Sequence, residues 1–310
     1  MNGILNIYKE AGFTSHDVVA KLRGIVKQKK IGHTGTLDPD AEGVLPVCLG
    51  NATKLCGLLS EKEKTYEAVL LLGQTTDTQD LSGKILSTAP VAVEEEAVRE
   101  AVLSFLGDYD QVPPMYSALK VNGRKLYELA REGKEVERKA RGVRILDVKI
   151  HWVRLPEVSF SVTCSSGTYI RTLCQDIGEK LGCGGCMKHL LRTRVDRFGL
   201  PDSLRLSQVE ELMREGRIGE ALIPVDQVFA AYPGIRMKEK SSRLVHNGNP
   251  FSEQDIETSD QLHDSEHETE KDWVRVYDFS GSFVGVYRRQ EERGGTFSYR
   301  PVKMFLSSKA

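Results

Sequence analysis

The 310-residue sequence predicts an α+β protein whose main sheet is mixed, mainly antiparallel, and flanked by helices. Three observations support this fold class. Strand-like segments and helix-like segments interleave, they lack the regular strand–helix–strand rhythm of a parallel sheet, and a β-rich segment lies near the C-terminus. Apolar residues make up 40% of the chain, which is enough to bury a sizeable core.

Three helices are predicted from apolar periodicity and end signals. Residues 13–30 begin with Thr14 and Asp17 at the spacing of a capping box, and their apolar residues recur on one face. Residues 94–106 show the same one-sided pattern. A third helix begins after the Ser-Ser-Gly turn of the GTYIRTL segment, and we expect it to end at Gly182.

Strands are predicted in two regions. Residues 65–72 form a β-rich run that ends at Gly73, and residues 158–164 alternate between apolar and polar. Near the C-terminus, residues 273–279 and 282–288 flank a Ser-Gly turn, which is typical of a β-hairpin.

The sequence predicts two domains, 1–232 and 233–310, separated near a Tyr-Pro-Gly sequence. Residues 258–272 of the smaller domain are polar, acidic and almost devoid of apolar side chains, so we expect a mobile surface loop. His263 and His267 in this loop could bind a metal, but we interpret them as solvated loop residues.

Charge is distributed unevenly along the chain, although the net charge is only −1. Residues 101–200 hold 17 Lys/Arg against 11 Asp/Glu, whereas residues 251–310 hold 8 against 12. Phosphates respond to the field of a local patch, so the basic middle of the chain is compatible with an RNA partner. An ordinary solvated surface accounts for the charge pattern equally well.

Residues 111–142 differ in character from their neighbours. Pro113 and Pro114 break any preceding element, and basic residues then interleave with tyrosines. Cations can contact phosphates while rings stack on bases, so we favour a loop that grips folded RNA over a solvated helix with Glu–Lys pairs. The basic residues are Lys120, Arg124, Lys125, Arg131, Lys134, Arg138, Lys139 and Arg141.

Cysteine usage favours a reduced compartment. No export signal is recognised at the start of the sequence, and no apolar run approaches the roughly 18 residues that a membrane span needs. Cys183 and Cys186 form a lone CxxC, and because a closed zinc site needs four ligands we expect no zinc.

Residues 32–50, GHTGTLDPDAEGVLPVCLG, are the most informative about chemistry. Their glycines and prolines are typical of a loop, and loops on rigid scaffolds carry functional sites. Pro39 restricts Asp38 to an extended backbone, which fixes the direction of its carboxylate. A carboxylate held in this way can serve as a nucleophile or a base, although Asp-Pro is also a common turn former.

Residues 32–47 of this segment resemble the catalytic motif GHxGxLDPxAxGxLP of the TruB family of bacterial tRNA pseudouridine-55 synthases. Residues 64–83 resemble the family's tyrosine motif, residues 111–133 its RNA-gripping insertion, and residues 164–185 its G-T-Y-I-R-x-L segment. The chain from about residue 235 resembles the small PUA-type RNA-binding domain often attached to such enzymes.

This resemblance implies a pseudouridine synthase fold and a C-terminal PUA-like domain. It implies a cytoplasmic enzyme that extrudes one uridine of the TΨC stem-loop of tRNA and isomerises it to pseudouridine. The reaction needs no redox change, phosphate transfer or external atom, so we expect no cofactor and no metal. The long insertion and short tail favour a monomer that acts on tRNA without a protein partner or a membrane.

The resemblance assigns catalytic roles to three residues. Asp38 matches the aspartate that attacks or assists at the ribosyl centre, and Tyr66 matches the tyrosine that stacks on the extruded base and helps to remove a proton. Arg171 matches the arginine that pairs with this aspartate, and a nearby guanidinium is expected to lower the pKa of Asp38. A cation at a helix start is poorly placed for the helix dipole, which favours a functional role for Arg171.

Further residues match substrate-contacting positions. His33 matches the histidine that enters the TΨC loop, and Tyr169 and Leu190 match residues that line the base pocket. Leu190 could equally belong to a helix core. Asp80 matches an aspartate with a supporting or RNA-contacting role. Lys9 matches the lysine of a K-P-x-G motif, but this sequence has glutamate where the motif has proline.

Three alternatives remain open at the level of sequence. A non-catalytic RNA-binding or RNA-chaperone protein is disfavoured, because binding polyanionic RNA does not require the Asp38, Tyr66 and Arg171 set. A glycoside hydrolase with Asp38 and Asp80 as paired carboxylates is disfavoured by the abundant Lys/Arg and by the low aromatic content of 7%. The third alternative is a relative that acts on another RNA.

Overall fold

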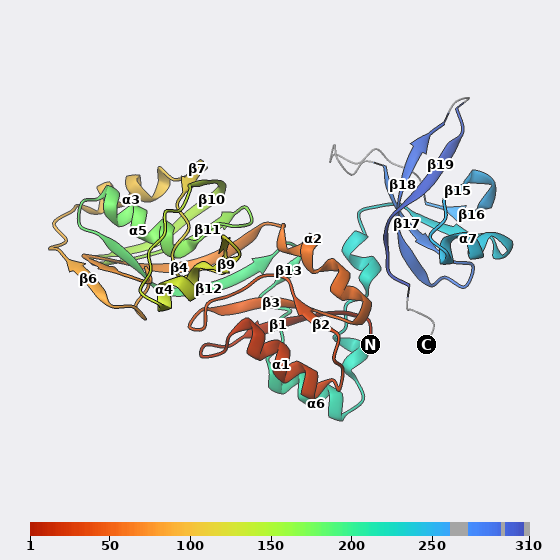
Figure 1. Cartoon of the computed structure of the whole chain (residues 1–310), viewed down its shortest axis with the longest axis horizontal. Helices are drawn as coiled ribbons and strands as arrows, with labels where there is room; N and C mark the ends of the chain where they lie inside the picture. Colours follow the sequence, from red (N-terminus) through yellow and green to blue (C-terminus); the bar gives the residue numbers. More distant parts are fainter. Residues whose placement is uncertain (261–271, 293–294, 307–310) are drawn as a thin grey trace.

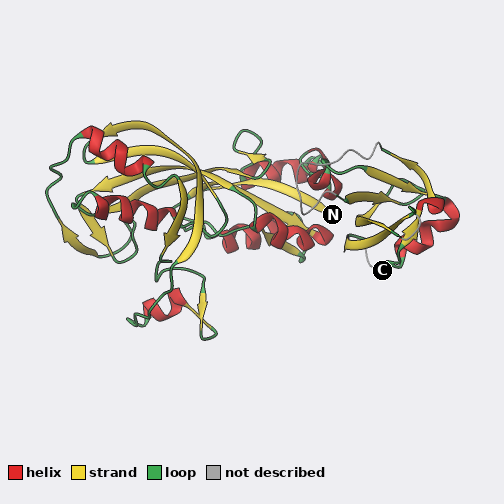
Figure 2. Ribbon diagram, turned by 90° about the horizontal axis from the view of Figure 1, so that it is seen from above, coloured by secondary structure: helices red, strands yellow, loops and turns green. Residues whose placement is uncertain are grey.

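A computed structural model describes residues 1–260, 272–292 and 295–306. The molecule is elongated, with a large sheet and its helices at one end and a smaller β-rich unit at the other (Figure 1). The same arrangement is visible from above, where a small segment with a short helix projects sideways from the large sheet (Figure 2).

The large sheet contains β1 (Gly3–Lys9), β2 (Ile31–His33), β3 (Glu42–Leu49), β4 (Lys64–Leu72), β7 (Gly107–Gln111), β10 (Arg141–Arg154), β11 (Glu157–Cys164), β12 (Gly185–Val195) and β13 (Phe198–Gly199). Its central order is β1-β3-β12-β4-β11-β10-β7, with β2 paired to β3 and β13 paired to β12. The β3–β12 pair is parallel, and the other pairs are antiparallel. The predicted class, an α+β protein with a mixed, mainly antiparallel sheet, is therefore confirmed.

The helices cover the sheet in two groups. They are α1 (Ser15–Ile25), α2 (Cys56–Ser60), α3 (Glu95–Leu103), α4 (Leu126–Arg131), α5 (Ile170–Lys180) and α6 (Leu206–Arg214). Apolar residues of α3 and α5 share a core with β4 and β11, whereas those of α1 and α6 share another with β1 and β3. Two cores therefore meet near the middle of the large sheet, close to β12.

Short elements connect these parts. Two small hairpins are formed by β5 (Gln74–Thr76) with β6 (Ile85–Thr88), and by β8 (Lys120–Val121) with β9 (Arg124–Lys125). The described 3₁₀ turns are η1 (Gly50–Leu55), η2 (Ile218–Glu220), η3 (Val225–Phe229), η4 (Glu239–Ser241) and η5 (Glu253–Asp255). The β8–β9 hairpin lies within the predicted insertion.

The predicted helix at 13–30 is correct at its start and too long at its end. Thr14 caps α1, and its side chain and that of Asp17 form the predicted capping box. The helix ends at Ile25, because Lys27 adopts a left-handed backbone with a φ of 50°. The predicted helix at 94–106 corresponds to α3, and the one ending at Gly182 corresponds to α5.

The predicted strands at 65–72 and 158–164 are confirmed as β4 and β11, and the two strands pair with each other. The 32–50 segment is less irregular than its composition indicated, because β2 and β3 take up both of its ends. Leu190 lies on strand β12, so the alternative that it belongs to a helix core is wrong.

The second sheet follows the order β15-β19-β18-β17-β14-β16. Its elements are β14 (Gly234–Met237), α7 (Ser242–His246), β15 (Phe251–Ser252), β16 (Ile256–Ser259), β17 (Trp273–Tyr277), β18 (Phe283–Glu291) and β19 (Phe297–Met304). The predicted hairpin is confirmed as the antiparallel pair β17–β18. Of the predicted loop at 258–272, Thr258 and Ser259 lie in β16, and residues 261–271 lie outside the described residues.

The smaller sheet is attached to the larger one through polar and apolar contacts. Val286 and Phe305 share a core cluster with Ile4 and Val44. Lys54 donates a hydrogen bond of 2.8 Å to a backbone carbonyl at the end of β19. These contacts join the smaller sheet to the β1–β3 edge of the larger one.

Gly43 permits a close backbone approach in the large sheet. It lies at the parallel β3–β12 contact with a φ of +107°, and an added Cβ would lie 2.2 Å from the carbonyl oxygen of Arg192. We predict that Gly43→Ala lowers the free energy of unfolding by about 2–4 kcal/mol, measured by urea denaturation. The matched control is Gly24→Ala in α1, where no atom lies within 4 Å, and it should stabilise by about 0.5–1 kcal/mol. Equal effects of the two substitutions would contradict the close approach.

Candidate active site

The loop between β2 and β3 carries Asp38 at the junction of the two cores. The backbone N–H of Ala41 donates to the carbonyl oxygen of Asp38 at 3.2 Å, which closes a turn with Pro39 at its second position. The buried Ser15 hydroxyl accepts a hydrogen bond of 2.9 Å from the backbone N–H of Leu37. Helix α1 therefore anchors the residue that precedes Asp38.

Arg171, in the first turn of α5, forms a two-point ion pair with Asp38. Its Nε lies 2.9 Å from Asp38 Oδ2, and its Nη2 donates to Asp38 Oδ1 at 3.2 Å. The guanidinium also donates to the carbonyl oxygens of Thr78 at 2.9 Å and Tyr116 at 2.8 Å. The Arg171 side chain is 6% exposed and that of Asp38 is 37% exposed. The pair therefore presents the carboxylate to solvent and keeps the guanidinium beneath it.

The start of α5 is fixed by Gln111, the last residue of β7. Its side-chain carbonyl accepts from the backbone N–H of Tyr169 at 2.7 Å, and its amide donates to the Tyr169 carbonyl at 3.0 Å. Gln111 is 1% exposed, so water does not compete for these bonds. This clamp holds the residue two positions before Arg171, and no sequence pattern predicts it.

The environment of Asp38 raises the pKa of its carboxyl above the ordinary value. Burial is the main cause, Arg171 acts in the opposite direction, and the nearby Asp80 carboxylate raises the pKa further. The contribution of Arg171 to the pKa has the predicted sign, but the effect of burial, which the sequence does not reveal, is larger. A desolvated and more basic carboxylate oxygen is better suited to form a bond or accept a proton.

Asp80 is a second carboxylate near the Nε of Arg171. Its Oδ2 is 3.9 Å from Arg171 Nε, while its Oδ1 accepts from the Thr78 hydroxyl at 2.6 Å and from the Ser82 backbone N–H at 2.9 Å. The Asp80 side chain is 18% exposed. Its placement supports Arg171 and leaves Asp38 as the more accessible of the two carboxylates.

Tyr66 occupies the centre of the large sheet on β4. Its register partners are Val162 on β11 and Arg192 on β12, and it is 7% exposed. Burial raises the pKa of the phenol, while the nearby Arg192 guanidinium acts in the opposite direction. The phenol is therefore neutral at ordinary pH.

His33, Tyr169 and Leu190 lie around this centre. The His33 ring packs edge-on against His16 at 5.3 Å between centroids, and burial lowers its pKa, so the ring is neutral near pH 7. Tyr169 precedes α5 directly, and burial raises the pKa of its phenol. Leu190 is buried and pairs with Ala68 on β4, two residues from Tyr66.

Lys9 lies beneath the Asp38 loop, with no exposed surface. Its ammonium donates to the carbonyl oxygens of Pro39 at 2.9 Å, Ala41 at 2.5 Å and Glu10 at 3.2 Å. The side chain that matched a substrate-contacting lysine therefore holds two carbonyls of the turn that follows Asp38. Desolvation lowers the pKa of this ammonium to about 8.

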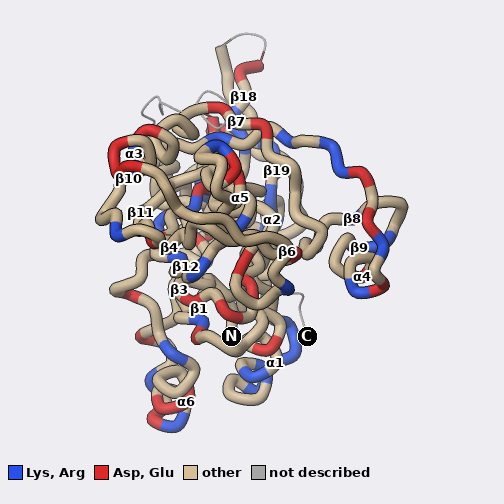
Figure 3. The backbone as a smooth tube through the Cα atoms, turned by 90° about the vertical axis from the view of Figure 1, so that its left-hand side faces the viewer, with Lys and Arg blue, Asp and Glu red and all other residues tan. Residues whose placement is uncertain are grey.

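The basic residues of the predicted insertion lie apart from this centre. Lys120, Arg124 and Lys125 lie on the β8–β9 hairpin, which projects from the body of the protein together with α4 (Figure 3). Arg124 forms an exposed ion pair with Glu132, and Lys125 Nζ lies 5.3 Å from the centroid of the Tyr127 ring. The helix here has only six residues, so a long solvated helix does not account for the segment.

Arg192 is a central residue that the sequence did not single out. It is 1% exposed and donates to carbonyl oxygens of the Asp38 loop. Its sequence context, an arginine in the basic LLRTRVDR stretch, gives no sign of burial. The alternation of buried and exposed residues along β12 is also obscured, because this strand contains two register shifts against β4.

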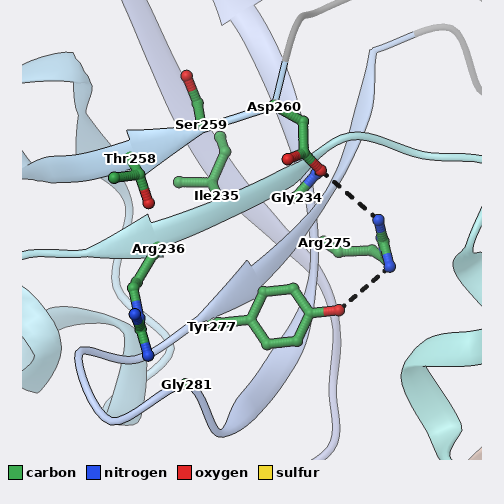
Figure 4. Close-up of a pocket in the computed structure, with 9 residues that line it drawn as sticks. All are labelled: Gly234, Ile235, Arg236, Thr258, Ser259, Asp260, Arg275, Tyr277 and Gly281. Carbon is green, nitrogen blue, oxygen red and sulfur yellow. Dashed lines mark hydrogen bonds and ion pairs between the residues drawn. The ribbon is translucent and has the colours of Figure 1, made fainter.

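A separate cavity of about 340 Å³ lies in the smaller sheet (Figure 4). Arg236, Asp260, Arg275 and Tyr277 contribute its polar groups, and Arg275 donates to the Tyr277 hydroxyl at 3.2 Å. It also holds a carboxylate, guanidinium groups and a phenol, but it lies outside the segments that resemble the catalytic motifs, so we place the chemistry at Asp38. Among the described residues, no cluster of three or more His, Cys, Asp or Glu side chains is arranged to hold a metal. Nor does any helix in that part of the chain have the length and apolar character of a membrane span.

Comparison with known proteins defines the class. The family model described as the N-terminal domain of TruB family pseudouridylate synthases matches residues 23–170. The family model described as the C-terminal domain of tRNA pseudouridylate synthase B matches residues 171–230. The tRNA pseudouridine synthase B of Lachnoclostridium phytofermentans is 52% identical, over 99% of this chain and 100% of the relative. That of Clostridium kluyveri is 44% identical with the same coverage.

Solved structures agree with this result. The chain matches a chain of a Cbf5-Nop10-Gar1 complex with a TM-score of 0.71 and 25% identity, over 98% of this chain and 85% of that chain. The fold also matches a chain of an H/ACA RNP bound to a substrate RNA containing 2′-deoxyuridine, with a TM-score of 0.70. The protein is thus a pseudouridine synthase, an isomerase, with a PUA-like C-terminal half-barrel. Within this class, the chain belongs to the TruB family.

The buried Lys9 ammonium predicts a measurable pH dependence of stability. Its pKa is about 8 in the folded chain and about 10.5 when unfolded, so the unfolded chain binds more protons between these values. The contribution of Lys9 to the free energy of unfolding should therefore rise as the pH increases from about 8 to about 10.5. Urea unfolding of wild type and Lys9→Met across this range isolates the contribution, because Lys64 and other titrating groups are common to both proteins. A constant difference between the two proteins would contradict the burial of a titrating ammonium.

Proposed function

We propose that this enzyme converts the uridine at position 55, in the TΨC loop of tRNA, to pseudouridine. Near-full-length relatives named tRNA pseudouridine synthase B support tRNA as the substrate. The observation that carries the proposal is the accessible Asp38 carboxylate, held by the buried Arg171 guanidinium within the matched family motif. The catalytic residues proposed are Asp38, Tyr66 and Arg171.

The proposed chemistry breaks the N1–C1′ bond, rotates the uracil and forms a C5–C1′ bond. C5 loses a proton and N1 gains one, so atoms and electrons balance without a cofactor or metal. A single carboxylate can act first as nucleophile and later as leaving group, which suits Asp38. Arg171 orients this carboxylate. It also stabilises the negative charge that the carboxylate regains when it departs as the leaving group.

Tyr66 is proposed to form the floor on which the extruded base stacks. A phenol whose pKa is raised is a poor base for the C5 proton, so its flat face is the more useful property. His33, Tyr169 and Leu190 are proposed to surround the base after it leaves the loop. Their contacts offset part of the few kcal/mol that extrusion costs.

The remaining parts are proposed to position tRNA. The β8–β9 hairpin offers Lys120, Arg124 and Lys125 to the phosphates. The second family model ends at residue 230 and the second sheet begins at Gly234, which supports a catalytic domain at 1–232 and a PUA-like RNA-binding domain at 233–310. We further propose that the chain acts in the cytoplasm as a monomer that needs no protein partner, whereas the similar Cbf5 structure is that of a Cbf5-Nop10-Gar1 complex.

Asp38→Asn should abolish product formation and leave tRNA binding close to wild type, because the amide keeps the shape and loses the nucleophile. Unmodified tRNA transcript is the substrate, carbodiimide mapping locates pseudouridine, and filter binding gives the Kd. A wild-type protein that modifies no TΨC uridine would refute the substrate. An active Asp38→Asn variant would refute the proposed centre, and loss of binding alone would favour an RNA-binding role.

Charge reversal on the insertion should weaken binding in a salt-dependent manner. The triple variant Arg124→Glu, Lys125→Glu and Arg131→Glu should raise the Kd on the order of 10- to 100-fold at low salt. The slope of log K against log salt should fall in magnitude by about two to three.

The matched control reverses three exposed arginines outside the insertion, Arg99, Arg214 and Arg217, and alters the net charge by the same amount. If both triple variants lose affinity equally, the effect is general repulsion and the insertion is not a specific grip.

A further inference from the structure

Arg192 is the largest of the fully buried side chains, and it lies directly beneath the loop that carries Asp38. It belongs to β12, where its backbone pairs with Gly43 on one side and with Tyr66 on the other. The strand thus brings one guanidinium between the two proposed catalytic elements, the Asp38 loop and the Tyr66 strand.

The guanidinium of Arg192 binds both ends of the loop. Its Nε donates to the carbonyl oxygen of Val44 at 2.7 Å, just after the loop. Its Nη1 and Nη2 donate to the carbonyl oxygens of Thr36 at 3.4 Å and Gly35 at 3.3 Å, just before Asp38. A planar donor fork with fixed directions can hold three carbonyls at once, which an ammonium cannot do with the same geometry.

The charge of Arg192 is unusual in its surroundings. Among the described residues it forms no ion pair with an acidic side chain, and its hydrogen bonds go to backbone carbonyls. Burying a cation without a counter-charge costs free energy, and hydrophobic packing alone does not require one. Stability alone therefore does not explain an arginine at this position.

The positive field of Arg192 reaches the groups around the site. It lowers the pKa of the Tyr66 phenol and of the His33 imidazole relative to burial alone. It is also the second cation beneath the loop, since Lys9 holds the carbonyls of Pro39 and Ala41 from the opposite side. Together the two side chains bind the backbone before and after Asp38.

We infer that Arg192 is a positioning residue for the reaction: its donor fork fixes the Asp38 loop on strand β12, next to the Tyr66 strand β4. This inference rests on the proposed active site. It assigns to Arg192 no contact with substrate, and it assigns to the fork geometry, rather than to charge alone, the correct position of the Asp38 carboxylate.

The test is a comparison of single-turnover rate with tRNA affinity in Arg192→Lys. This variant keeps the charge but cannot hold all three carbonyls, so Asp38 should be displaced. A displacement of about 1 Å can reduce the rate on the order of 100-fold. We expect that loss in the single-turnover rate with tRNA transcript, with a Kd for tRNA close to that of wild type.

Chemical rescue separates positioning from general structural damage. In Arg192→Ala, added guanidinium chloride at millimolar concentration should occupy the vacated fork position and restore part of the rate, whereas the same concentration of urea should not. Arg194→Ala is the matched control, because Arg194 lies two residues along the same strand with an exposed side chain. It should keep the wild-type rate and should not respond to guanidinium. If Arg192→Ala does not fold, the rate and affinity of Arg192→Lys test the inference.

A wild-type rate for Arg192→Lys would overturn the inference. So would a loss of rate matched by an equal loss of tRNA affinity and of thermal stability, because that result indicates a purely structural role. Asp38→Asn distinguishes this failure from failure of the proposed function. If Asp38→Asn is inactive while Arg192→Lys is normal, the inference alone is wrong, whereas an active Asp38→Asn variant removes the active site on which it rests.

Discussion

The ion pair between Arg171 and Asp38 joins the start of helix α5 to a loop 133 residues earlier in the chain. The guanidinium is buried, and a buried cation is tolerated only when its donors are satisfied. Carbonyls of Thr78 and Tyr116 take two of these donors, and the Asp38 carboxylate takes two more. The pair can close only when the β2–β3 loop, the base of the insertion and α5 are all in place. It therefore couples the assembly of the fold to the formation of the site.

Three buried cations bind this loop. Arg171 binds the Asp38 side chain, while Lys9 and Arg192 bind backbone carbonyls on either side of it. The arrangement concentrates positive charge beneath a carboxylate that is itself partly desolvated. Such a fixed environment need not reorganise as charge shifts during the reaction, which is the main advantage of preorganised electrostatics.

Much of the site could be predicted because its residues lie in contiguous motifs. Asp38, Tyr66 and Arg171 each lie in a segment whose composition or resemblance points to them, and the structure brings Arg171 to Asp38. Arg192 could not be found, because bulges in β12 disturb the alternation that would have revealed a buried position. The effect of Arg171 on the pKa of Asp38 could be predicted, but the larger effect of burial could not, because motif spacing shows the partner charge and not the depth of burial. The end of α1 was missed because a left-handed Lys27 has no distinctive sequence signal.

The contact between Asp38 and Arg171 can be measured by a double-mutant cycle on stability. Urea unfolding of wild type, Asp38→Asn, Arg171→Met and the double variant gives the coupling free energy of the two side chains, independently of any activity. A buried two-point ion pair should give a coupling of at least about 1 kcal/mol, since removing one partner leaves the other unsatisfied. Effects that add to within about 0.3–0.5 kcal/mol would show that the two side chains do not interact, and would contradict the site described above.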